Sequence, residues 1–159
     1  MRARRFFMFC LALFGIALFS RSASAQLLPK NTLSLAAAKK MASAAEAEAA
    51  KNKWNMVIAV VDDGGHLIYL EHMDDAQIGS IDVAQGKART AVRFRRPSKF
   101  FEDALAANHL GVITLNDITA IRGGLPVMVD GKALGAIGVS GGDPEQDEQC
   151  AEAGLTVLH

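Results

Sequence analysis

Two segments of the chain each place a short turn between two runs of strand-forming residues. In the first, MVIAVV (residues 56–61) is followed by DDGG and then by HLIYLEHM (residues 66–73). In the second, GGLPVMV (residues 123–129) precedes Asp130-Gly131 and then KALGAIGVSGG. Turns of this length and composition join antiparallel strands, and Asp-Gly is a strong type I′ signal. The two hairpins therefore predict an antiparallel sheet.

Helical segments surround these hairpins. Ser34 is placed to cap a helix whose apolar stripe comprises Leu35, Ala38, Ala42, Ala45 and Ala49. Ser80 is placed to cap a second helix, which must end near Pro97, and a short third helix follows Ser98. Asp143 precedes Pro144 in a pattern close to a capping box, which predicts a last helix. The order predicts a single α+β domain with an antiparallel sheet.

Three details refine this fold. The run MVIAVV has no polar alternate, so we expect its strand to be covered on both faces. Gly135 and Gly138 lie within the last strand, which suggests that another backbone or a ligand approaches closely there. Residues 111–120 predict a loop or a short strand.

The N-terminus has the pattern of a secretory signal peptide. MRARRFF is positively charged, MFCLALFGIALF is a short apolar run, and SRSASA supplies small residues for cleavage after Ala25. We expect residues 1–25 to be a signal peptide, residues 26–32 a leader, and residues 33–159 the folded domain. A periplasmic or secreted protein, without stable membrane insertion after cleavage, is the corresponding expectation. An uncleaved anchor is the alternative.

Charge and cysteine content narrow the partners. Residues 26–159 carry 13 basic and 17 acidic residues, so their net charge is −4, and nucleic acid is a poor candidate partner. Only Cys150 remains after cleavage, so no disulfide forms within the chain. The thiol is expected to be buried on a helix face, or else to pair between chains.

Three histidines of the expected domain are candidate iron ligands or acid–base groups: His66, His72 and His109. Strict alternation places His66 and His72 on one face of their strand, about 20 Å apart at roughly 3.3 Å per residue. Two side chains so far apart cannot bind the same metal ion within one chain. Tyr69 on the other face is a weaker iron-ligand candidate. Each of the four is alternatively an ordinary surface or core residue.

Basic residues are concentrated in the second helix and just beyond it. The run comprises Lys87, Arg89, Arg93, Arg95, Arg96 and Lys99. Arginine forms bidentate, charge-assisted hydrogen bonds with carboxylates, so Arg93 and Arg96 are candidates for binding a carboxylate-bearing ligand. A solvated helix face or an intersubunit surface would explain the same run.

Several segments together resemble a known family. AVVDDGGHLIYLEHMDDA, Gly86-Lys87-Ala88-Arg89-Thr90-Ala91, GGLPVMVDGKALGAIGVSGG and DPEQDEQCAEAG are similar to the GlcG/HbpS-like haem-binding family, also called haem-degrading domains and related to the C-terminal domain of PduO-type proteins. The resemblance implies a five-stranded antiparallel sheet flanked by helices, homo-oligomeric assembly and, in several members, haem binding. His72 stands where the family pattern usually has arginine, so no role is carried over to it.

Three functional hypotheses follow. The first is an exported homo-oligomer that binds haem b for storage, sensing or degradation. In this hypothesis the iron ligand is His72, His66 or His109, in that order of preference, and arginines pair with the propionates. The second is an enzyme or accessory protein for a small organic acid, held by strand 134–142 and by Arg93 or Arg96. The third is a non-catalytic oligomeric sensor-accessory protein that uses the basic run as an interface. Whether the chain is an enzyme stays open.

Overall fold

The computed structural model describes residue 26 and residues 28–158, so the expected signal peptide lies outside the described residues. The helices are α1 (Leu35–Asn52), α2 (Ser80–Phe94), α3 (Lys99–Ala106) and α4 (Pro144–Leu155). The strands are β1 (Val57–Asp62), β2 (Leu67–His72), β3 (Gly124–Val129) and β4 (Lys132–Ser140). The strand order is β2-β1-β4-β3, with every neighbouring pair antiparallel. The predicted α+β class is confirmed.

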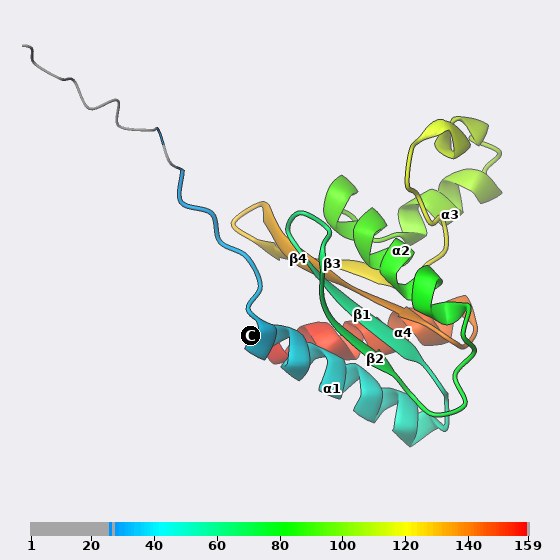
Figure 1. The fold of residues 1–159 in the computed structure, drawn as a ribbon. Helices are drawn as coiled ribbons and strands as arrows, with labels where there is room; N and C mark the ends of the chain where they lie inside the picture. Colours follow the sequence, from blue (N-terminus) through cyan, green and yellow to red (C-terminus); the bar gives the residue numbers. More distant parts are fainter. Residues whose placement is uncertain (1–25, 27, 159) are drawn as a thin grey trace, which may run out of the picture.

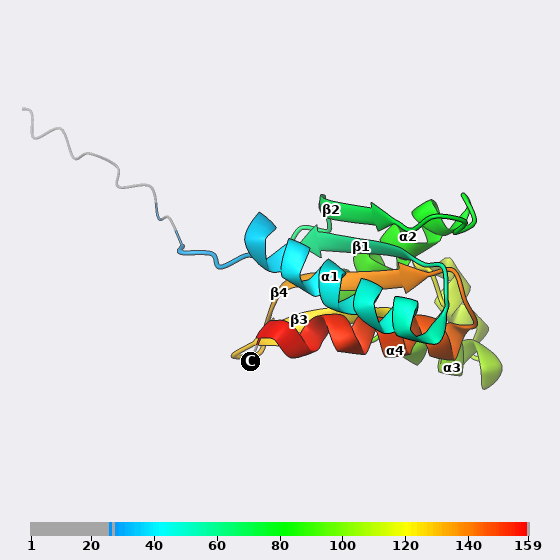
Figure 2. The same ribbon diagram turned by 90° about the horizontal axis from the view of Figure 1, so that it is seen from below.

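Helices cover both faces of the sheet. Figures 1 and 2 show α1 and α4 on one face and α2 on the other. The side chains of Met56, Ile58 and Val60 pack in the α1/α4 core, whereas those of Val57, Ala59 and Val61 pack on the α2 side. All residues from Val57 to Val61 are fully buried, which confirms that this strand is covered on both faces.

Local signals for turns and caps are confirmed. Asp130 and Gly131 have φ angles of 49° and 74°, as a type I′ turn requires. Ser34 accepts a hydrogen bond from the Ala37 N–H, and Asp143 with Gln146 forms a capping box. Ser80 instead occupies the first position of α2, where its buried hydroxyl accepts a hydrogen bond from Ser140.

The sheet has one strand fewer than the resemblance implied, because the described residues form four strands. Residues 111–120 contribute none of them. A 3₁₀ helix covers Leu110–Thr114, and Asp117 adopts a left-handed φ of 57°. The Thr119 N–H donates to Thr90 Oγ1 of α2 rather than to a strand carbonyl. This segment therefore packs along α2, where it hydrogen-bonds to a helix side chain, and it adds no strand to the sheet.

A β-bulge interrupts β2. Val61 pairs with Leu67 and Val60 pairs with Tyr69, so Ile68 is one residue more than β1 can match. Because paired residues point to the same side, Leu67 faces α2 and Tyr69 faces α1. The strict alternation that placed His66 and His72 on one face is therefore wrong, and His66 itself lies in the turn before β2.

Candidate functional site

A cavity of about 600 Å³ lies at the end of the sheet where both hairpins turn. Four parts of the chain line it: the leader, the β1–β2 turn, the end of α2 and the start of β4. The lining residues are Leu28, Pro29, Lys30, Asn31, Asp63, Val92, Arg93, Arg95, Lys132, Ala133 and Leu134. A cavity of this size is in the range of small-molecule sites, roughly 300–1,000 Å³.

The cavity combines apolar walls with a cationic rim. Lys30 Nζ lies 2.5 Å from Asp63 Oδ2, and Arg93 Nη1 lies 2.6 Å from Asp117 Oδ2. Among the described residues, no carboxylate oxygen lies within 4.0 Å of the charged groups of Arg95 or Lys132. These two cations approach the cavity from the residue just after α2 and from the first residue of β4, and their charges are available to an anionic ligand.

His66 lies on the turn that borders this cavity. Asp62 Oδ1 accepts the backbone N–H groups of Gly64 and His66 at 2.8 and 2.9 Å, and Asp62 Oδ2 lies 3.3 Å from His66 Nδ1. Burial alone would raise the pKa of Asp62, but these hydrogen bonds outweigh it and hold the pKa below its usual value. The carboxylate thus orients the ring and leaves Nε2 facing away from it, as carboxylates do behind metal-binding histidines.

The turn also contacts the basic end of α2. A Cβ built on Gly65 would lie 3.6 Å from Arg89 Cγ and 3.7 Å from both Arg93 Nε and Val92 Cγ1. Val92 and Arg93 line the cavity, so the turn carrying His66 packs directly on its wall. The structure therefore brings two predicted site residues, His66 and Arg93, to one region.

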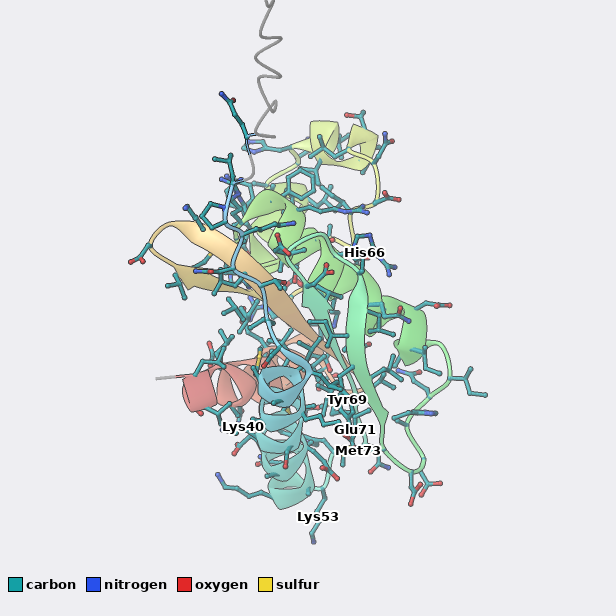
Figure 3. All side chains as sticks on the ribbon, turned by 60° about the vertical axis from the view of Figure 1, so that its left-hand side comes forward. Lys40, Lys53, His66, Tyr69, Glu71 and Met73 are labelled. Atoms are coloured by element: carbon teal, nitrogen blue, oxygen red, sulfur yellow. The ribbon has the colours of Figure 1, made fainter. Side chains whose placement is uncertain are left out.

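The other predicted residues lie elsewhere. His72 ends β2, where its Nε2 is 2.9 Å from the Ala76 carbonyl oxygen, and His109 is exposed before the 3₁₀ helix. The Tyr69 hydroxyl donates a hydrogen bond to the Glu71 carboxylate at 2.8 Å. This hydrogen bond is the main reason why the pKa of Tyr69 is raised. Figure 3 shows Tyr69 and Glu71 beside α1, apart from His66. The Arg96 guanidinium stacks on the Phe100 ring at 4.4 Å.

The glycine-rich end of β4 does not meet the arginines. Gly141 and Gly142 border a second cavity of about 370 Å³ together with Lys53 and Trp54, and no arginine lines it. Leu134, at the other end of the strand, lines the first cavity with Arg93. Of segment 134–142, only Leu134 therefore lines the same cavity as Arg93.

Lys87 is a buried residue that the sequence interpretation placed in the basic run. Its side chain is 1% exposed and its ammonium group pairs with Asp147. The spacing of Ala84, Lys87, Ala88 and Ala91 follows the i, i+3, i+4, i+7 rule of a buried helix face, so a signal for its burial was present.

The described part of the chain has neither a ready-made metal cluster nor a membrane-spanning helix. Residues 28–158 contain no cluster of three or more His, Cys, Asp or Glu side chains suited to hold a metal ion. In the same region, no helix has both the length and the apolar character needed to cross a membrane.

Comparison with known proteins gives concordant matches. The family described as "Haem degrading protein HbpS-like" matches residues 33–156. Protein GlcG of Escherichia coli K12 is 43% identical over 111 residues, which cover 70% of this chain and 83% of GlcG. An uncharacterized 15.0 kDa protein of Citrobacter freundii is 44% identical over 128 residues, covering 78% of this chain and 90% of that protein.

Solved structures share the fold. A double mutant of HbpS from Streptomyces reticuli superposes with a TM-score of 0.80 at 34% identity, covering 85% of this chain and 92% of HbpS. A complex of PduOC with haem superposes with a TM-score of 0.72 at 26% identity, covering 79% and 94% of the two chains. From its sequence and its fold, the chain belongs to the HbpS-like family, which includes GlcG and is structurally related to the haem-binding C-terminal domain of PduO.

Proposed function

We propose that this chain is an exported haem-binding protein whose haem occupies the cavity at the turn end of the sheet. Family membership and the likeness to the haem complex of PduOC support a haem ligand. The observation that carries the location is the cavity of about 600 Å³, with Val92 and Leu134 among its apolar walls and Arg95 and Lys132 without acidic partners in the described chain.

The cavity fits the chemistry of haem at its carboxylate edge. Haem is a mostly apolar ring with two propionates, so it requires apolar walls, cations at one edge and an iron ligand. Arg95 and Lys132 would hold the propionates by charge-assisted hydrogen bonds. Bound haem would supply the iron, and the chain's own residues bind the ring and orient it.

The iron ligand in this proposal is His66. No imidazole, thiol, thioether or phenol is among the lining residues, so the ligand must come from an adjacent segment. His66 is on the bordering turn, and Asp62 engages its Nδ1 while leaving Nε2 available. His72 uses Nε2 on the Ala76 carbonyl and lies at the far end of β2. The geometry thus favours His66 over His72, reversing the preference based on sequence.

The cationic rim gives the direct test of location. Haemin and metal-free protoporphyrin IX would be titrated into residues 26–159 and into the Arg95→Ser/Lys132→Ser variant. Loss of two charge-assisted hydrogen bonds, each about 1.5 kcal/mol, predicts about 100-fold weaker binding of both porphyrins. A Lys40→Ser/Lys51→Ser variant removes two cations from α1, away from the cavity, and should bind as the wild type does. Equal affinity in all three proteins would place the porphyrin elsewhere.

A small organic acid is the second candidate ligand, favoured by the absence of an iron-ligating side chain from the lining. The same Arg95 and Lys132 would then hold a carboxylate without a metal. Calorimetric titration with small mono- and dicarboxylates, in the absence of haemin, separates the two ligand classes. Saturable acid binding with no saturable porphyrin binding would favour this candidate.

Storage, sensing and degradation are all compatible uses of a haem site in an exported protein. We propose a periplasmic or secreted location from the N-terminal signal pattern, and homo-oligomeric assembly from the family resemblance. Fractionation with detection of the processed N-terminus tests the first, and light scattering of the purified chain tests the second.

A further inference from the structure

The segment before α1 forms one wall of the proposed haem cavity. Leu28, Pro29, Lys30 and Asn31 line it, although they belong to no helix or strand. Figure 1 shows this segment leading away from the start of α1. Part of the proposed site is thus formed by a segment outside the regular secondary structure.

The segment is anchored firmly at one end only. The Leu33 N–H donates to the Leu134 carbonyl at 3.1 Å, and the Leu33 side chain, 8% exposed, packs against Gly135. Beyond that point, the Lys30–Asp63 ion pair is the one side-chain tie between residues 28–31 and the folded domain that is seen in the described chain. Lys30 is 69% exposed, and ion pairs with an exposed partner stabilise weakly. The segment can therefore open without unfolding the domain.

Two side chains of the segment could interact with a bound ligand, one through apolar contact and one through its charge. Leu28 lines the cavity but is 88% exposed, so the described residues cover little of its apolar surface. An apolar ring in the cavity would bury part of it. Lys30 faces the same space, and a ligand carboxylate would compete with Asp63 for its ammonium group.

We propose that residues 28–31 form a strap over the ligand cavity, latched by Lys30 and Asp63, with Leu28 packing on the bound ring. The inference rests on the proposed function, because it takes the cavity to be the porphyrin site. It makes the leader part of the binding site and makes ligand exchange depend on opening of the strap.

The lone buried thiol permits a test in residues 26–159. Cys150 is fully buried, so a nitroxide label introduced through Asn31→Cys, at an exposed strap residue, attaches selectively at the strap and leaves Leu28 and Lys30 in place. Electron paramagnetic resonance then reports strap mobility before and after saturation with metal-free protoporphyrin IX. Lys30→Gln removes the latch. Lys51→Gln is the matched control, because Lys51 pairs with Glu48 on α1 with 73% and 19% exposure, close to the 69% and 12% of the latch.

We expect Lys30→Gln, and not Lys51→Gln, to increase nitroxide mobility without ligand, and protoporphyrin IX to reduce it in the parent. In unlabelled protein, Lys30→Gln should speed haemin transfer to apomyoglobin about two- to fivefold. Equal mobility and equal transfer rates in the two lysine variants would overturn the strap, as would porphyrin binding that leaves the label unchanged. If neither porphyrin binds, the proposed function fails, and the ligand-free mobility comparison decides the latch alone.

Discussion

Lys87 Nζ lies 2.5 Å from Asp147 Oδ2, and the two side chains are 1% and 3% exposed. Lys87 also donates to the Val139 carbonyl at 3.0 Å, and Asp147 accepts the Gly142 N–H at 3.0 Å. The pair therefore joins α2 to α4 through the end of β4. Burial lowers the pKa of Lys87 and raises that of Asp147, and the charge of each partner opposes the other's shift.

Lys87→Met is expected to be strongly destabilising. It leaves the Asp147 carboxylate buried without its counter-charge, which costs about 3–5 kcal/mol of unfolding free energy. Urea denaturation followed by circular dichroism measures the loss. Lys51→Met, which breaks a surface pair with Glu48, should change stability by less than about 1 kcal/mol. Similar losses in the two variants would contradict a structural role for the buried pair.

Gly138→Ala is expected to disturb the packing of α2 on the sheet. A Cβ at this position would stand 2.1 Å from the Ala84 carbonyl oxygen and 2.6 Å from Ala88 N, so helix and strand must separate. We expect a loss of about 1–3 kcal/mol by urea denaturation, as for other overpacked interiors. Gly111→Ala is the control: nothing lies within 4 Å of its added Cβ, and a change within about 0.5 kcal/mol is expected. If Gly138→Ala were as mild as this control, the close helix–strand approach would be wrong.

Cys150 should be unreactive while the chain is folded. Burial raises the pKa of its thiol to about 12, so almost no thiolate exists near neutral pH. In residues 26–159, Ellman's reagent should label one thiol per chain in guanidinium chloride and essentially none in native buffer. Prompt native labelling, or a disulfide-linked dimer on non-reducing gels, would show that the thiol is accessible after all.

Asp62 should make stability depend on pH in a defined direction. Its folded pKa lies below 3.8, the value of the free side chain, so the folded state favours the carboxylate. The stabilisation is complete above that value and is lost as the pH falls through the folded pKa. Asp62→Asn removes the charge but keeps an oxygen for the turn. The stability difference between wild type and variant should therefore be largest near neutrality and shrink in acid; a difference that is constant with pH would refute the assignment.

Much of the fold was predictable because its signals are local. The Asp130-Gly131 turn and the cap at Asp143 need only a few neighbouring residues to be recognised, and both predictions are confirmed. The full burial of Val57–Val61 in β1 followed from the lack of polar alternates in that run. By contrast, the bulge at Ile68 arises from the pairing of β2 with β1. The alternation of residues within β2 alone does not predict it.

The candidate site was less predictable because it is assembled from distant segments. The leader, the β1–β2 turn, the end of α2 and the start of β4 meet only in the folded chain, so the partnership of Arg95 with Lys132 has no sequence signature. The sequence interpretation preferred His72 to His66 as the iron ligand, and only the hydrogen bonds to Ala76 and Asp62 in the folded chain separate the two histidines by geometry. Lys87 was misplaced because its charge suggested a surface, although its position on the helix predicted burial.

The most direct test of the proposed site is the visible spectrum of haemin-loaded His66→Ala, His72→Ala and His109→Ala, each checked for native circular dichroism. The proposal predicts a saturable Soret shift near one haem per chain in wild type, retained in the His72 and His109 variants and lost or moved in His66→Ala. Loss in His72→Ala with an unchanged spectrum in His66→Ala would contradict it, and so would four identical spectra.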